Sequence, residues 1–139
     1  MRILAIIILT FISSRLFGAD CEWHSYVGTN HYSFQVGWTA IDKTPIWREG
    51  DDQPPLAARK ALRLARAELS KLLKNGERWR LDTVGLSPMI GHDGHWVYLV
   101  CFYPPAPPGG LEEGIIEYLT IPVLMDGIVL EPKISRWRK

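Results

Sequence analysis

The polar run His92-Asp93-Gly94-His95 is the part of this chain whose residue types are best suited to chemistry. Two imidazoles and a carboxylate are side chains that bind zinc in proteins. A specific zinc motif such as H-E-x-x-H gains its geometry from a helix that holds both histidines on one face. Here Gly91 and Gly94 predict a turn, which imposes no regular geometry on the side chains. Two hypotheses follow: a metal-dependent hydrolase built on His92 and His95, and a hydrogen-bonded hairpin turn, which we favour.

Other patterns of known catalytic machinery do not occur in the sequence. Neither cysteine lies in a recognisable catalytic pattern, and no glycine-rich phosphate loop opens the longest expected helix. Five serines lack the context of a nucleophile elbow: Ser25, Ser33, Ser70, Ser87 and Ser135. We therefore expect a protein that is not an enzyme and that has no catalytic residue, no cofactor site and no metal site.

A stripe of three arginines is the strongest candidate for a binding surface. Arg59, Arg63 and Arg66 recur at helical spacing, so they would lie on one face of a helix. Such a stripe could meet an unknown protein partner with an acidic surface, a phosphate group or anionic lipid. The alternative is a solvated helix face whose long side chains cover apolar surface.

Four tryptophans form a second candidate surface. They could line a groove for a peptide or a sugar, because aromatic residues are enriched at interfaces, or they could fill the core. These residues are Trp38, Trp47, Trp79 and Trp96.

The elements expected to position these residues follow from hydrophobic periodicity. A helix is predicted over about 55–74, where apolar residues recur in steps of three and four and where Asn75-Gly76 would supply a left-handed stop. Residues 20–32 are expected to form an irregular arm. The predicted strands are 33–41, 80–86 and 96–103, followed by a final hairpin of 115–125 and 128–134 around Asp126-Gly127. The expected fold class is α+β, with one long amphipathic helix packed on an antiparallel sheet of about four or five strands.

An export signal is predicted at the N-terminus, over residues 1–19. Arg2 precedes a short apolar run, and the small pair Gly18-Ala19 suits a cleavage site. The run is about ten residues long, while a membrane-spanning helix needs about twenty. We therefore expect an exported protein, periplasmic or secreted, without a stable membrane anchor after cleavage.

The mature chain, residues 20–139, is expected to form one α+β domain. It holds 14 basic and 15 acidic residues, and this near-neutral balance argues against a nucleic-acid partner. In an oxidising compartment Cys21 and Cys101 are candidates for a disulfide. The alternative is two thiols, with Cys101 buried in the sheet.

The order of elements over about 54–134 resembles the PepSY domain of small exported bacterial proteins. The matching segments are the alanine-rich 58–65, the strand 95–100 and the turn region 123–130, in which the family's Thr is missing. The resemblance implies a non-catalytic protein-binding or accessory module, with a proposed peptidase-inhibitory role in the family. The cystatin fold is a near neighbour, and Gln35-Val36-Gly37 is faintly similar to its Q-x-V-x-G loop. The expected function is such a binding module; the alternatives are the hydrolase on His92 and His95 and a purely structural envelope protein.

Overall fold

The computed structural model describes residues 21–106 and 117–137. The predicted signal peptide, residues 1–19, lies outside the described residues. Within the described part, no helix is both long and apolar enough to cross a bilayer.

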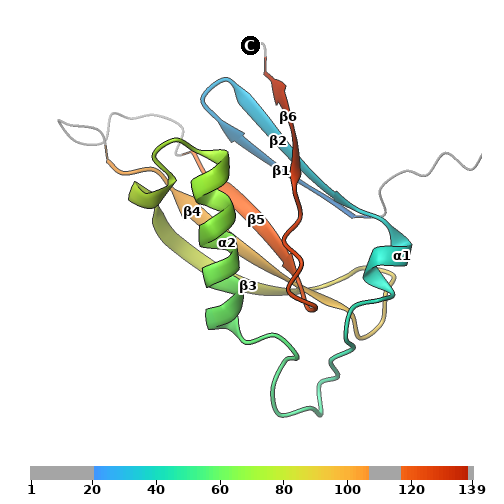
Figure 1. Ribbon diagram of the computed structural model, residues 1–139. Helices are drawn as coiled ribbons and strands as arrows, with labels where there is room; N and C mark the ends of the chain where they lie inside the picture. Colours follow the sequence, from blue (N-terminus) through green and yellow to red (C-terminus); the bar gives the residue numbers. More distant parts are fainter. Residues whose placement is uncertain (1–20, 107–116, 138–139) are drawn as a thin grey trace, which may run out of the picture.

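The described part of the chain begins with a β-hairpin that belongs to the first of two sheets. Strand β1 (Cys21–Val27) pairs antiparallel with β2 (Asn30–Val36), and Gly28 at the turn has a positive φ of 58°. The last strand, β6 (Pro132–Arg136), pairs antiparallel with the other edge of β2. Figure 1 shows these three strands side by side, so the first and the last described strand lie in one sheet.

The second sheet has the order β3-β4-β5. Strand β3 (Arg80–Pro88) pairs antiparallel with β4 (Trp96–Tyr103), and β4 pairs antiparallel with β5 (Leu119–Leu124). The two sheets meet through β1 and β5, where Tyr26 and Tyr118 form an isolated antiparallel bridge. Close to it, the Thr120 amide donates to the buried Ser25 hydroxyl at 3.0 Å.

In residues 21–106 and 117–137, helical structure is limited to three segments, which lie between β2 and β3 in the sequence. A single-turn helix, α1 (Trp38–Ile41), follows β2, and α2 (Ala58–Leu72) is the longest helix, followed by the short 3-10 turn η1 (Gly76–Arg78). Helix α2 lies beside β4 and β5 (Figure 1) and buries Ala61, Ala65 and Leu69 in the core. The sequence predicts a left-handed stop at Asn75-Gly76, and this prediction is wrong, because Gly76 does not have a positive φ. A Cβ there would lie 2.5 Å from the Leu69 carbonyl oxygen, so close packing on α2 is what requires glycine.

One apolar core is shared by the described parts of the chain. Side chains from both sheets and from α2 contribute to it, and the segment between β2 and α2 adds Ile41 and Leu56. The largest fully buried side chains are Tyr32, Phe34, Phe102, Ile41, Leu69, Leu119, Ile121, Leu124 and Met125.

The predicted fold class is wrong. The structure is mostly β, with two three-stranded antiparallel sheets and one helix of 15 residues, in place of a long helix on a single sheet of four or five strands. The helix is shorter than predicted at both ends, because Pro54-Pro55 lies in the loop and Leu73 is already extended. The difference lies mainly at residues 21–32, which form β1 and the start of β2 rather than part of an irregular arm.

The two cysteines belong to different sheets. Cys21 pairs in register with Val36 on β2, whereas Cys101 pairs with Thr83 on β3 and Thr120 on β5. No disulfide links them in this structure. Cys101 is half-buried, and its burial raises the pKa of the thiol, which favours the protonated form.

Candidate functional site

The connection between β3 and β4 is a tight turn closed by its own backbone. The Met89 amide donates to the His95 carbonyl at 2.9 Å, the His92 amide to the Met89 carbonyl at 3.1 Å, and the His95 amide to the His92 carbonyl at 3.0 Å. Gly91 and Gly94 have φ values of 81° and 76°, in the left-handed region that glycine enters at little cost. The glycines and the backbone bonds thus form the turn that the sequence predicts here.

His95 ties this turn to the loop after α1. Its Nδ1 lies 2.9 Å from the Thr44 hydroxyl oxygen, and both side chains are buried. The Thr44 hydroxyl donates its single proton to the Ile41 carbonyl at 2.7 Å, so it accepts from His95. Nδ1 of His95 therefore carries a proton, and the bond fixes the ring in place.

His92 contacts α1 and the residue that follows it. Its side chain is buried, its Nδ1 lies 3.5 Å from a carboxylate oxygen of Asp42, and its ring centroid is 3.9 Å from that of Trp38. The two histidine rings are 6.4 Å apart and nearly perpendicular. Their Nδ1 atoms point to different partners, so the two imidazoles do not converge on a common point. Within residues 21–106 and 117–137, no group of three or more His, Cys, Asp or Glu could hold a metal ion.

A second set of contacts joins the turn to residues 46 and 47. The Trp47 amide donates to the Gly94 carbonyl at 2.8 Å, and the Trp96 indole donates to the Trp47 carbonyl at 3.0 Å. A Cβ on Gly94 would lie 2.6 Å from a methyl carbon of Ile46. Gly94 is therefore required twice, for its backbone conformation and for the close approach of Ile46.

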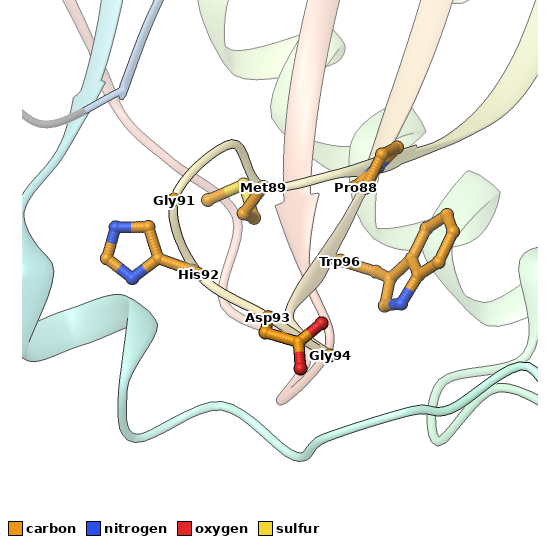
Figure 2. Close-up of a pocket in the computed structure, with 7 residues that line it drawn as sticks. All are labelled: Pro88, Met89, Gly91, His92, Asp93, Gly94 and Trp96. Carbon is orange, nitrogen blue, oxygen red and sulfur yellow. The ribbon is translucent and has the colours of Figure 1, made fainter.

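Three large apolar side chains remain exposed around this braced turn, and we call them the apolar rim. Ile90 is 92% exposed at the tip of the turn, Trp38 is 52% exposed beside His92, and Ile46 is 49% exposed beside Gly94. Beside the turn lies an open pocket of about 470 Å³, and none of the three rim residues lines it. Figure 2 shows its lining, with His92 and Trp96 on opposite sides of Met89. The carboxylate of Asp93 also lines the pocket, and Asp42 is exposed nearby against His92.

The three arginines of the predicted stripe do not share one role. Arg59 and Arg63 are exposed on α2. Arg66 is half-buried: its guanidinium donates to the Trp79 carbonyl and lies 4.6 Å from the centroid of the Phe102 ring. Arg66 on α2 thus contacts both Trp79 and β4. Of the stripe, Arg59 and Arg63 remain exposed for a partner.

The four tryptophans do not line one groove. Trp79 is buried in the core, Trp47 and Trp96 pack edge to face with ring centroids 5.1 Å apart, and Trp38 lies at the apolar rim. Sequence reasoning missed Ile90 and Ile46 altogether. The available signal for Ile90 was a large apolar residue inside a segment bounded by Pro88 and Gly91, where turns are normally polar.

Comparison with known proteins finds no family model that matches this chain. No curated protein and no solved structure matches it either.

Proposed function

We propose that this is an exported, non-catalytic protein-binding module whose contact surface is the apolar rim of Trp38, Ile46 and Ile90. The observation that carries the proposal is the exposure of Ile90, 92%, at the tip of a turn held by buried histidines. A large aliphatic side chain gains about 1.5–3 kcal/mol when it is fully buried. A partner that covers Ile90 would recover that free energy.

Rigidity favours binding at this surface. The turn is closed by three backbone hydrogen bonds and is joined to residues 42–47 through His92, His95 and Gly94. Binding a surface already held in one conformation avoids the entropic cost of ordering it. Aromatic residues are enriched in the buried centres of interfaces, which suits Trp38.

The chemistry of the surface indicates what kind of partner it fits. Asp93 lies on the same turn as Ile90 and lines its pocket, and Asp42 lies exposed against His92. A partner segment with a large apolar side chain next to a lysine or arginine would match both features. Export and the PepSY resemblance remain predictions from the sequence, and the proposal does not depend on the resemblance.

Site-specific photo-crosslinking in the exporting cell tests this function. A crosslinker at position 90 should capture a specific partner, and the same group at position 63, exposed on α2, should not. With the captured partner purified, Ile90→Asp should weaken binding at least tenfold. Ile134→Asp is the matched control, because Ile134 is also exposed but lies on β6 in the other sheet. Equal capture from positions 63 and 90, or undiminished binding by Ile90→Asp, would show that the rim is not the contact surface.

A further inference from the structure

The outer face of the β1–β2–β6 sheet carries a chain of hydrogen-bonded polar side chains that the proposed function does not use. His24 on β1 and His31 on β2 are diagonal neighbours, since His24 is paired with Ser33 and Tyr26 with His31. Nδ1 of His24 lies 2.9 Å from Nε2 of His31. The ring centroids are 5.1 Å apart and the planes differ by 20°, so the two nitrogens lie between the rings and face each other.

The far nitrogen of each ring also has a partner. Nε2 of His24 lies 3.6 Å from a carboxylate oxygen of Glu22, and Nδ1 of His31 lies 3.3 Å from the Ser135 hydroxyl. Glu22 is itself held by the Ser33 hydroxyl and the Gln35 amide, each at 2.6 Å. A carboxylate or another oxygen acceptor on the far nitrogen is the arrangement that orients metal-binding histidines.

The two facing nitrogens can share one proton or bind one metal ion. In the metal-free protein a proton on one of them makes an N–H···N hydrogen bond of 2.9 Å. If each ring instead carries its proton on the far nitrogen, toward Glu22 or Ser135, both facing nitrogens present lone pairs that a metal ion beside them could accept.

We propose that His24 and His31 form a chelating site for a late first-row divalent cation of the nickel, copper and zinc class. Two ligands at about 2.0–2.1 Å and at right angles, as in the tetragonal geometry of Cu²⁺ and Ni²⁺, are about 2.9 Å apart, which is the observed separation of the two nitrogens. The rings must tilt so that both lone pairs converge on one point beside the line joining them. The soft torsion of the histidine ring about its last bond allows that tilt.

The ligand set indicates which cations bind. Imidazole suits Zn²⁺, Cu²⁺ and Ni²⁺, whereas Mg²⁺ prefers oxygen ligands. Both rings belong to paired strands of one sheet, so the backbone holds them together before the metal arrives. The remaining coordination positions would be taken by water, because the face is exposed.

Calorimetric titration of the full chain with Ni²⁺ or Zn²⁺ at neutral pH tests the site. These two cations are preferred as probes because neither oxidises the thiols of Cys21 and Cys101. We expect saturable binding of one ion per chain and none of Mg²⁺. His24→Gln and His31→Gln should each weaken binding at least tenfold. Glu22→Gln should weaken it by about 10–100-fold, the usual effect of losing a group that orients a ligand.

Lys133→Gln is the matched control, because Lys133 lies on the same face and contacts Gln35 but neither histidine ring. It should bind as the unchanged protein does, and circular dichroism should show that every variant is folded. His92 and His95 are present in all variants, so they cannot account for a loss. Unchanged affinity in both histidine variants, or no binding by the unchanged protein, would overturn the proposal.

Discussion

Thr44 and His95 are 51 residues apart in the sequence and are joined by a buried hydrogen bond of 2.9 Å between the threonine hydroxyl and the imidazole Nδ1. Because the same hydroxyl donates to the Ile41 carbonyl, one side chain links α1, the following loop and the β3–β4 turn. This link joins the turn that carries Ile90 at its tip to the rest of the fold.

Thr44→Val should destabilise the fold by about 1–3 kcal/mol. The substitution keeps the shape but leaves the buried Nδ1–H of His95 without an acceptor. Urea unfolding followed by tryptophan fluorescence measures the change. Thr39→Val is the control, since Thr39 is exposed on α1 and its replacement should stay within about 0.5 kcal/mol. Equal costs for the two variants would mean that the link contributes nothing.

Arg66→Ala should cost about 2 kcal/mol in unfolding free energy. It removes a charged hydrogen bond to the Trp79 carbonyl and a cation–π contact with Phe102. Arg63→Ala, one turn away and exposed, should cost less than about 0.5 kcal/mol. Urea denaturation compares the unfolding free energies of the two variants. Equal losses would mean that the contacts of Arg66 contribute no more to stability than an exposed side chain does.

Leu69→Ala should cost about 2–5 kcal/mol, because Leu69 on α2 is fully buried and its truncation leaves a cavity. Leu62→Ala should cost clearly less, since Leu62 is only partly buried at the edge of the core. Thermal and urea unfolding of both variants check the order. A larger loss for Leu62 would show that the buried face of α2 is wrongly assigned.

The Cys101 thiol should react slowly with iodoacetamide in the folded protein. Burial raises the pKa of this thiol, so the reactive thiolate is scarcer near pH 8 than in an exposed cysteine. Because the folded pKa is higher than the unfolded one, stability from this group is present below the unfolded pKa and falls as pH rises toward the folded value. Mass spectrometry of a Cys21→Ser variant, with and without urea, measures the rate.

The contradicting outcome is a rate in the folded protein as fast as in urea. Alkylation of the unchanged, unreduced protein addresses the disulfide separately, because two adducts mean that Cys21 and Cys101 are not bonded to each other.

Local signals in the sequence were sufficient where an element depends on its own residues. Strand β4 runs from Trp96 to Tyr103 as predicted, because an unbroken β-branched and aromatic run has one favourable backbone conformation. The turn at Asp126-Gly127 is also present, with Gly127 at a φ of 87° and a Leu124–Ile128 hydrogen bond. The predicted turn at residues 91–94 is present as well, because Gly91 and Gly94 adopt the positive φ values that the turn needs.

Only the tertiary structure decided the elements whose pairing depends on a segment far away in the sequence. The chain after Asp126-Gly127 bridges to β5 at Val129 and then pairs as β6 with β2. The paired residues of β2 and β6 are 98 to 106 positions apart, and no local pattern specifies such a pairing. Strand β1 was missed because its buried face includes the polar Ser25, which the Thr120 amide satisfies only in the folded state.

The same division holds for the candidate sites. The sequence by itself determined that His92 and His95 lie in a turn, since the glycines beside them require one. It could not determine that the rings face Asp42 and Thr44, or that His24 and His31 face each other, because strand register and loop packing set those contacts. Exposure of Ile90 is likewise a property of the whole fold. A side chain is exposed only when every other segment packs elsewhere, and that outcome is settled by the free energy of the complete core.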